Sequence, residues 1–363
     1  MSDNLKRYLA IRAALIQLYP GPLSGNLLRH LHTLAALISG IVASGRTNLP
    51  HVASHLPGGT QRESRIKRFE RFLRNERITQ ETFFLPFAGA LLASLPPVPL
   101  VLVMDASAIG RGCLALVVSV VFQQRALPLA WIVVKASKGH LADQTHRHLL
   151  EKVSRLIRPE QEVIFLGDGE FDGCGLLAAL SERGWCFVCR TAKNAHLCEE
   201  ETGYAFSFAD LFVEAGDLIA FEQVRFTQAG WGPLLAVAVW EIRCKEPLFL
   251  VSNLELGHEA LFWYKKRFLI ETLFSDQKSR GFFLHKSHLS DPCRLARLLL
   301  ATCLAYIWLV LLGAQVKQNP VWRRAVHRSG RCDLSLFSLG RAWLQECLNE
   351  GWRVPVVFTW SKL

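Results

Sequence analysis

The chain has 363 residues, and half of them are hydrophobic, which is enough for a large buried core and excludes a disordered chain. Lysine and arginine (42) outnumber aspartate and glutamate (31), giving a net charge of +11. The excess lies at the ends, because residues 1–95 carry +7, residues 96–260 carry −6 and residues 261–363 carry +10. Basic ends indicate a polyanionic partner, either nucleic acid or an acidic membrane surface. An acidic middle needs its own reason, such as carboxylates that hold metal cations.

Residues 1–95 are expected to form a helical, basic region. Apolar residues recur at helical spacing over 27–42, and the segment 61–77 is amphipathic, with an apolar stripe surrounded by basic side chains. A charge run of this kind is usually a solvated surface helix. Seven basic residues against three acids in 62–77 favour instead a helix that contacts phosphates. Its candidate DNA-binding side chains are Arg65, Lys67, Arg68 and Arg71.

Residues 96–194 alternate between β-rich runs and helical patterns. The expected elements are strands at 99–104, 113–123 and 127–134, a helix at 143–158, a strand at 163–166, a helix at 175–183 and a strand at 185–190. Three meandering strands followed by βαβ units predict an α/β fold with a mixed sheet covered by helices.

Residues 195–258 interrupt this alternation and are expected to form an inserted β-rich subdomain. Its β-rich segments are 206–212, 218–226, 233–244 and 247–254. Helices are expected again within 259–315, over 259–278 and 293–313. The basic C-terminal tail, 316–363, begins with a cluster of arginines, Arg323, Arg324, Arg328 and Arg331.

The segment 298–313 is almost entirely apolar, and its composition resembles that of a transmembrane helix. It is shorter than the ~20 residues that a bilayer core requires, so we favour a fully buried helix and no membrane partner. The chain also opens without the apolar run of an export signal, which favours a cytoplasmic protein with reduced cysteines.

Two aspartates, Asp105 and Asp168, each follow an apolar strand-like run. Sites of open α/β sheets gather at strand ends, so both carboxylates are expected at one edge of the sheet. Small residues flank both positions, which gives a moderate indication of a carboxylate site.

A polar stripe follows the expected helix 259–278. Tyr264, Arg267, Glu271 and Lys278 fall within one narrow sector of a helical projection, beside an apolar sector that includes Phe262. A salt-bridged amphipathic helix would give the same geometry.

The residue types decide between these interpretations. The pattern Tyr-x2-Arg-x3-Glu-x6-Lys, preceded by the two aspartates, resembles the signature of insertion-sequence DDE transposases. More narrowly, it resembles insertion-sequence family four, the cut-and-paste group with the YREK motif. The segments 105–107, 167–171, 275–282 and 289–292 agree, and the resemblance covers about residues 45–315.

The resemblance implies a ribonuclease H-like core whose catalytic and metal-binding residues are Asp105, Asp168 and Glu271. Two Mg²⁺ ions, replaceable by Mn²⁺, would clamp the oxygens of an in-line displacement. Tyr264, Arg267 and Lys278 would hold DNA phosphates. The implied partners are the element's ends and target DNA, bound by a homodimer in a nucleoid-associated complex. The implied reaction hydrolyses one DNA strand, cuts the other through a hairpin and then joins the freed ends to the target.

Other residues and functions stay open. Glu170 and Asp172 are possible further metal ligands, although we interpret them as loop acids. The resemblance also implies that an aromatic residue of the insertion stacks on a flipped base; Trp231 and Trp240 are the candidates, with Trp263 closer to the core, although a core role is commoner for a tryptophan. The alternative to an active enzyme is a catalytically inactive, transposase-derived DNA-binding protein.

Overall fold

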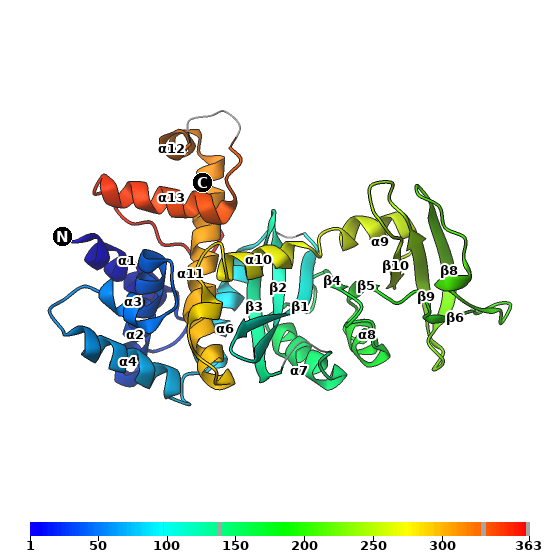
Figure 1. The fold of residues 1–363 in the computed structure, drawn as a ribbon, viewed down its shortest axis with the longest axis horizontal. Coiled ribbons are helices and arrows are strands. Elements are labelled where there is room, and N and C mark those ends of the chain that lie inside the picture. Colours follow the sequence, from blue (N-terminus) through cyan, green and yellow to red (C-terminus); the bar gives the residue numbers. More distant parts are fainter. Residues whose placement is uncertain (97, 137–139, 328–331, 361–363) are drawn as a thin grey trace.

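A ten-stranded mixed sheet forms the centre of the chain, with helices at its faces and at one end (Figure 1). The computed structural model describes residues 1–96, 98–136, 140–327 and 332–360. The strands are β1 (Leu100–Gly110), β2 (Cys113–Phe122), β3 (Arg125–Lys135), β4 (Val163–Gly167), β5 (Cys186–Arg190), β6 (His196–Glu199), β7 (Ala205–Ser207), β8 (Leu218–Phe226), β9 (Trp231–Val239) and β10 (Leu248–Ser252). The α-helices are α1 (Asp3–Leu18), α2 (Gly25–Ser44), α3 (Leu49–Ser54), α4 (Arg62–Arg74), α5 (Gln80–Phe83), α6 (Leu85–Ser94), α7 (Asp143–Ser154), α8 (Cys174–Ser181), α9 (Gly257–Tyr264), α10 (Leu269–Gln277), α11 (Pro292–Gln318), α12 (Pro320–Val326) and α13 (Leu336–Asn349).

The first five strands form the core of the sheet in the order β3-β2-β1-β4-β5. Strands β1, β2 and β3 make an antiparallel meander, whereas β4 pairs in parallel with both β1 and β5. The apolar runs that predicted these strands are buried on both faces, as expected for a sheet covered by helices. The mixed α/β fold is ribonuclease H-like and follows a helical N-terminal region, which confirms the predicted fold class.

The β-rich insertion extends this sheet and does not form a separate layer. Strand β10 pairs antiparallel with β5, and β9, β8, β6 and β7 continue the sheet outward. The sequence predicted β-rich segments here but did not predict that they pair with the core sheet. An unpaired β5 would expose a row of backbone donors and acceptors, and β10 satisfies them.

The apolar segment 298–313 lies inside α11, whose 27 residues are longer than the sequence predicted. By length and composition alone, α2 and α11 are each long and apolar enough to cross a membrane. In α11, 89% of the most apolar stretch is buried, against α13, α2, α4 and β3. The prediction of a buried helix is confirmed, but by these contacts and not by the length of the segment.

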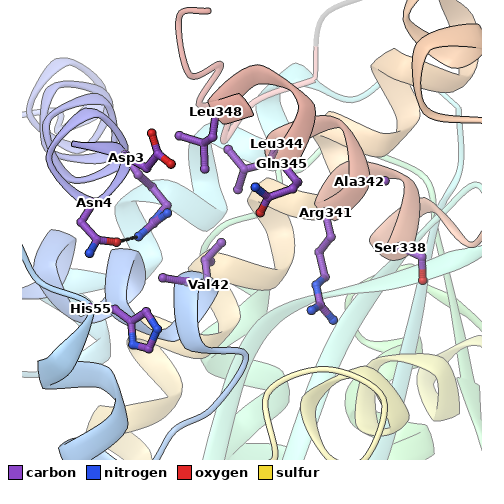
Figure 2. Close-up of a pocket in the computed structure, with 12 residues that line it drawn as sticks. Asp3, Asn4, Val42, His55, Ser338, Arg341, Ala342, Leu344, Gln345 and Leu348 are labelled. Carbon is purple, nitrogen blue, oxygen red and sulfur yellow. Dashed lines mark hydrogen bonds between the residues drawn. The ribbon is translucent and has the colours of Figure 1, made fainter. Parts of the chain in front are cut away.

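The C-terminal region is more ordered than a basic tail, because α12 and α13 pack on α11. The arginines Arg323 and Arg324 lie in α12, whereas Arg328 and Arg331 lie outside the described residues. Helix α13 also meets the N-terminal helices. Side chains from α1, α2 and α13 surround a cavity of about 490 Å³ (Figure 2). Segments from the two ends of the chain therefore lie side by side.

Candidate active site

Asp105 and Asp168 stand at the same level on neighbouring parallel strands. Strand β1 pairs with β4 so that Val103 is opposite Leu166, and an aspartate follows each of these residues two positions later. Asp105 lies inside β1 and not at its end, because the pairing with β2 continues past it. Strand β4 ends at Gly167, so the two carboxylates meet where the parallel pairing ends.

The loop after β4 fixes Asp168 through backbone contacts. Its Oδ1 accepts a 3.0 Å hydrogen bond from the amide of Glu170, and its carbonyl accepts one from Phe171 at 3.0 Å. A β-carbon at Gly167 would lie 2.6 Å from Cβ of Phe171, so this tight turn requires glycine. On β1, Oδ1 of Asp105 accepts a 2.7 Å hydrogen bond from the amide of Ala106.

The four residues of the polar stripe do not share one helix. Tyr264 ends α9, Arg267 lies in a turn, Glu271 is in the first turn of α10 and Lys278 follows the end of that helix. The prediction of one continuous helix over 259–278 was wrong. Backbone amides in this stretch bond to the carbonyl three residues earlier, as at Arg267 and Glu271, which tightens the chain and turns it.

The turn buries the arginine between two of the three carboxylates. Nη1 of Arg267 lies 3.9 Å from Oδ2 of Asp105, and Nη2 lies 3.3 Å from Oε1 of Glu271. The guanidinium also lies 4.4 Å from the ring centre of Phe268. Phe262, predicted to lie beside the buried face, is instead 56% exposed. Arg267 thus connects β1 to α10.

Lys278 and Tyr264 complete the same region. Nζ of Lys278 donates a 2.6 Å hydrogen bond to Oγ of Ser107, on the same face of β1 as Asp105. Burial lowers the pKa of Lys278, and the charge of Asp105 opposes this shift. Tyr264 is buried, and burial raises its pKa, while the positive charges of Arg267 and Arg190 lower it.

The electrostatics of Asp105 link all three carboxylates. The pKa of Asp105 is raised to about 6, first by burial and then by the negative charges of Asp168 and Glu271, while the hydrogen bond from the Ala106 amide and the positive charge of Arg267 act in the opposite direction. Three carboxylates that repel one another in a partly buried place favour a bound cation. Carboxylate oxygens are also the ligands that Mg²⁺ and Mn²⁺ prefer. The donor set therefore fits a hard divalent ion.

In the arrangement that the described residues adopt, no three histidine, cysteine, aspartate or glutamate side chains converge as a metal-binding group. Arg267 lies between Asp105 and Glu271 and supplies the positive charge there. The side chain of Glu271 is 58% exposed and so has room to turn.

The two neighbouring loop acids have partners of their own. Oε1 of Glu170 accepts hydrogen bonds from the amide of Leu141 at 2.7 Å and from Nε2 of His146 at 3.3 Å. Oδ2 of Asp172 accepts a 2.7 Å hydrogen bond from Thr191. These contacts give both acids a role in holding the loop.

The candidate tryptophans differ in their contacts. The ring of Trp231 lies 6.1 Å from that of Phe187, and Nε1 of Trp240 donates to the carbonyl of Cys244. Nε1 of Trp263 donates to Glu259 at 3.1 Å. All three side chains are partly exposed, so burial does not distinguish a candidate among them.

The basic segment forms α4, whose arginines face different surroundings. The guanidinium of Arg65 donates to the carbonyls of Ala53, Leu56 and Gly58, and so ties α4 to the turn after α3. Nε of Arg68 donates to Thr33 of α2 at 3.1 Å. Lys67 and Arg71 are exposed.

Sequence reasoning missed Ser107 and Arg190. Strand β5 pairs in parallel with β4 so that Cys189 is opposite Gly167, which places Arg190 level with Asp168. Among the described residues, no carboxylate lies within ion-pair distance of the Arg190 side chain. A basic residue at a strand end is common, so only the pairing register between β4 and β5 could have identified Arg190 as part of the site.

Comparison with known proteins agrees with this geometry. The family model described as "Transposase DDE domain" matches residues 97–308, a range that includes Asp105, Asp168 and Glu271. The chain belongs to this family. The broader prediction of a DDE transposase is therefore confirmed, whereas membership of insertion-sequence family four stays a prediction.

Among the solved structures to which the DDE-domain chain is similar is the "Cryo-EM structure of piggyBac transposase synaptic complex with hairpin DNA". The sequences are 11% identical, the TM-score is 0.48, and the match covers 97% of this chain and 80% of that chain. No curated protein matches the sequence.

Proposed function

We propose that this DDE-domain chain is an active, metal-dependent transposase. It binds the terminal inverted repeats of its element, cuts the DNA strands and joins the freed 3′ ends to target DNA. A homodimer on the DNA, associated with the nucleoid in the cytoplasm, would hold both ends. The observation that carries the proposal is the common level of Asp105 on β1 and Asp168 directly after β4, with Glu271 linked to Asp105 through Arg267.

Asp105, Asp168 and Glu271 would hold the metal ions, which we propose are two Mg²⁺ replaceable by Mn²⁺. Bound there, the ions would activate the attacking oxygen and stabilise the leaving 3′-oxygen. Arg267 would release the carboxylates and turn to a phosphate, for which its planar fork of donors is well suited.

Three basic side chains at this site would position the DNA. Arg267 and Arg190 offer paired donors, and Lys278 offers a point charge. Tyr264, close to Arg267, would contribute its hydroxyl. The exposed Lys67 and Arg71 of α4 would contact DNA away from the cut, with Arg65 holding that helix in place.

The test is a cleavage assay on DNA that carries the element's ends, with Mg²⁺, comparing wild type with Glu271→Gln. The variant keeps the size and the hydrogen-bonding oxygen of the side chain but removes its charge. We expect DNA binding within about twofold of wild type and loss of cleavage by at least a factor of about 10³, as when a group acting in the transition state is removed. Glu246→Gln, an exposed acid in the insertion, is the matched control.

Cleavage by Glu271→Gln at the wild-type rate would refute the assignment of this carboxylate. Wild-type protein that binds DNA but does not cut it with Mg²⁺ or Mn²⁺ would favour the alternative, an inactive DNA-binding descendant.

A further inference from the structure

A cavity lined by basic side chains lies between α2 and α4. These helices belong to the helical region, at the opposite end of the molecule from the β-rich insertion (Figure 1). The cavity has a volume of about 420 Å³. Its lining includes three arginines and two histidines and no aspartate or glutamate. The five basic residues are Arg29, His30, His32, Arg68 and Arg71. We propose that this cavity is a binding socket for backbone phosphates of double-stranded DNA.

The arginines of the cavity have no anionic partner among the residues that the structure describes. Nη2 of Arg29 donates to Oδ1 of Asn26, Nε of Arg68 to Oγ1 of Thr33 and Nε of Arg71 to the carbonyl of Lys67. All three acceptors are neutral, and no carboxylate within the described ranges pairs with these guanidiniums. Cations gathered without an anion repel one another, so a phosphate would stabilise the group.

One of the two histidines adds a ring nitrogen without a partner among the described residues, and the other is held by aromatic rings. Nε2 of His32 is shielded from solvent and has no hydrogen-bond partner in the described part of the chain. The ring of His30 lies 6.2 Å from that of Phe72 and 6.0 Å from that of Phe83, which fixes its orientation. Burial and the neighbouring arginines lower the pKa of both histidines, as expected where positive charge accumulates.

The lining favours a phosphate backbone over an acidic membrane. A membrane-binding helix exposes an apolar face beside its basic residues. In α4 the apolar stripe is buried inside the protein, with Phe69 and Leu73 at 0% and Phe72 at 3% exposure. The cavity between α4 and α2 is instead lined by charged side chains and by the amide groups of Asn26 and Asn75. Phosphate contacts from such side chains fix the position of a duplex without reading its sequence.

This inference rests on the proposed function, in which α4 contacts DNA, and identifies the cavity beside α4 as the place where the phosphates bind. It adds α2 to the interface, through Arg29, His30 and His32, which the sequence did not single out. The active site lies on the central sheet, so a duplex that reaches both must extend well beyond the bond being cut (Figure 1).

The experiment measures the affinity of the full chain for a short duplex of arbitrary sequence as a function of salt concentration. The variants are Arg29→Gln and the pair Arg68→Gln with Arg71→Gln. Arg74→Gln is the matched control, because Arg74 is exposed on the same helix but does not line the cavity. Each lost phosphate contact lowers the slope of log K against log salt by about 0.9.

We expect the double variant to lose about one to two units of slope and at least about tenfold in affinity, and Arg74→Gln to lose much less. The ring resonances of His30 and His32 should shift when wild type is titrated with the duplex or with inorganic phosphate. Unchanged thermal unfolding of the variants shows that the fold is intact. A variant that fails to fold is replaced by Arg29→Lys, which keeps the charge and should keep the slope.

Two results of the salt titration would overturn the socket: a double variant with the wild-type slope and affinity, or a loss no greater than that of Arg74→Gln. Ring shifts with inorganic phosphate but not with the duplex would also overturn it. These outcomes are separate from the proposed function, because Mg²⁺-dependent cleavage by wild type and its loss in Glu271→Gln can stand without the socket. Conversely, a chain that never cuts DNA can still bind it through this cavity.

Discussion

Nζ of Lys278 donates its hydrogen bond to Oγ of Ser107 over 2.6 Å, although 171 residues separate them in sequence. Ser107 lies two positions after Asp105 on β1, so both side chains are on the same face of the strand. The contact ties the end of α10 to the strand that carries the first carboxylate. It also holds a positive charge at the site where a DNA phosphate would bind.

This contact separates two roles for Lys278. If the lysine binds phosphate, Lys278→Met should lower DNA cleavage at least about tenfold and change the free energy of unfolding by no more than about 1 kcal/mol, the net value of one hydrogen bond. Ser107→Ala removes the same hydrogen bond but keeps the charge, so its cleavage rate should stay within about twofold of wild type. Steady-state cleavage and urea unfolding of both variants check this. Equal losses in both would mean that Lys278 acts only through Ser107.

The strands of the core could be predicted because their apolar runs are buried on both faces, and that pattern is visible in the sequence. The break between α9 and α10 could not. It depends on Arg267 turning inward to Asp105, a residue 162 positions away in the chain. The segment 259–278 contains neither proline nor glycine, so no residue in it indicated the turn.

The candidate site was predictable in its acids and less so in its cations. Asp105, Asp168 and Glu271 were predicted from their residue types and the family resemblance, and the structure brings them into one region. Arg190 was missed because its place beside Asp168 depends on the register between β4 and β5. Arg29 and His32 were missed because the apolar periodicity of α2 indicates a core helix and conceals the polar side chains that face α4.

The raised pKa of Asp105 predicts a pH-dependent stability change. Its pKa rises from 3.8 to about 6 in the folded chain, so the folded state binds this proton more tightly than the unfolded state. The contribution of Asp105 to the free energy of unfolding therefore decreases as the pH rises from about 4 to 6. Asp105→Asn keeps the acceptor for the amide of Ala106 and removes the charge.

Without divalent ions at pH 8, Asp105→Asn should therefore be more stable than wild type by about 1–3 kcal/mol, a range that allows for the partial exposure of the side chain. Below pH 4 the two proteins should be equally stable. Urea unfolding at pH 3.5 and pH 8 with a chelator checks this, with Glu246→Gln as a control that should show no pH-dependent difference from wild type. A variant less stable than wild type at pH 8 would contradict the prediction.

Metal binding to the carboxylates should be visible without DNA. A ligand present at ten times its dissociation constant stabilises the folded state by about 1.4 kcal/mol, so Mg²⁺ or Mn²⁺ should raise the melting temperature of wild type by about two degrees. Asp105→Asn and Asp168→Asn should lose this increase, and Glu246→Gln should keep it. Because protons compete for Asp105, the increase should also disappear below pH 6. Thermal unfolding with and without metal measures it, and an equal rise in Asp105→Asn would exclude this site.

The crossing of α11 and α13 gives a prediction about the fold itself. A β-carbon at Gly313 would lie 1.8 Å from the carbonyl oxygen of Leu336, and one at Gly340 would lie 1.9 Å from that of Leu309. The two backbones are therefore in direct contact, and any side chain at either position would force the helices apart. Since α11 contacts β3 and helices of both terminal regions, that shift would disturb the packing of much of the protein.

We expect Gly313→Ala or Gly340→Ala to destabilise the chain by about 3 kcal/mol or more, at the upper end of the overpacking range because backbone atoms cannot move aside. Gly89→Ala in α6 is the matched control, because its β-carbon would meet only Cδ2 of Leu156 at 3.9 Å. That variant should be stabilised by about 0.5–1 kcal/mol, the gain of alanine over glycine inside a helix. Urea unfolding of the three variants measures both signs, and a Gly313→Ala protein as stable as wild type would show that the helices can separate at little cost.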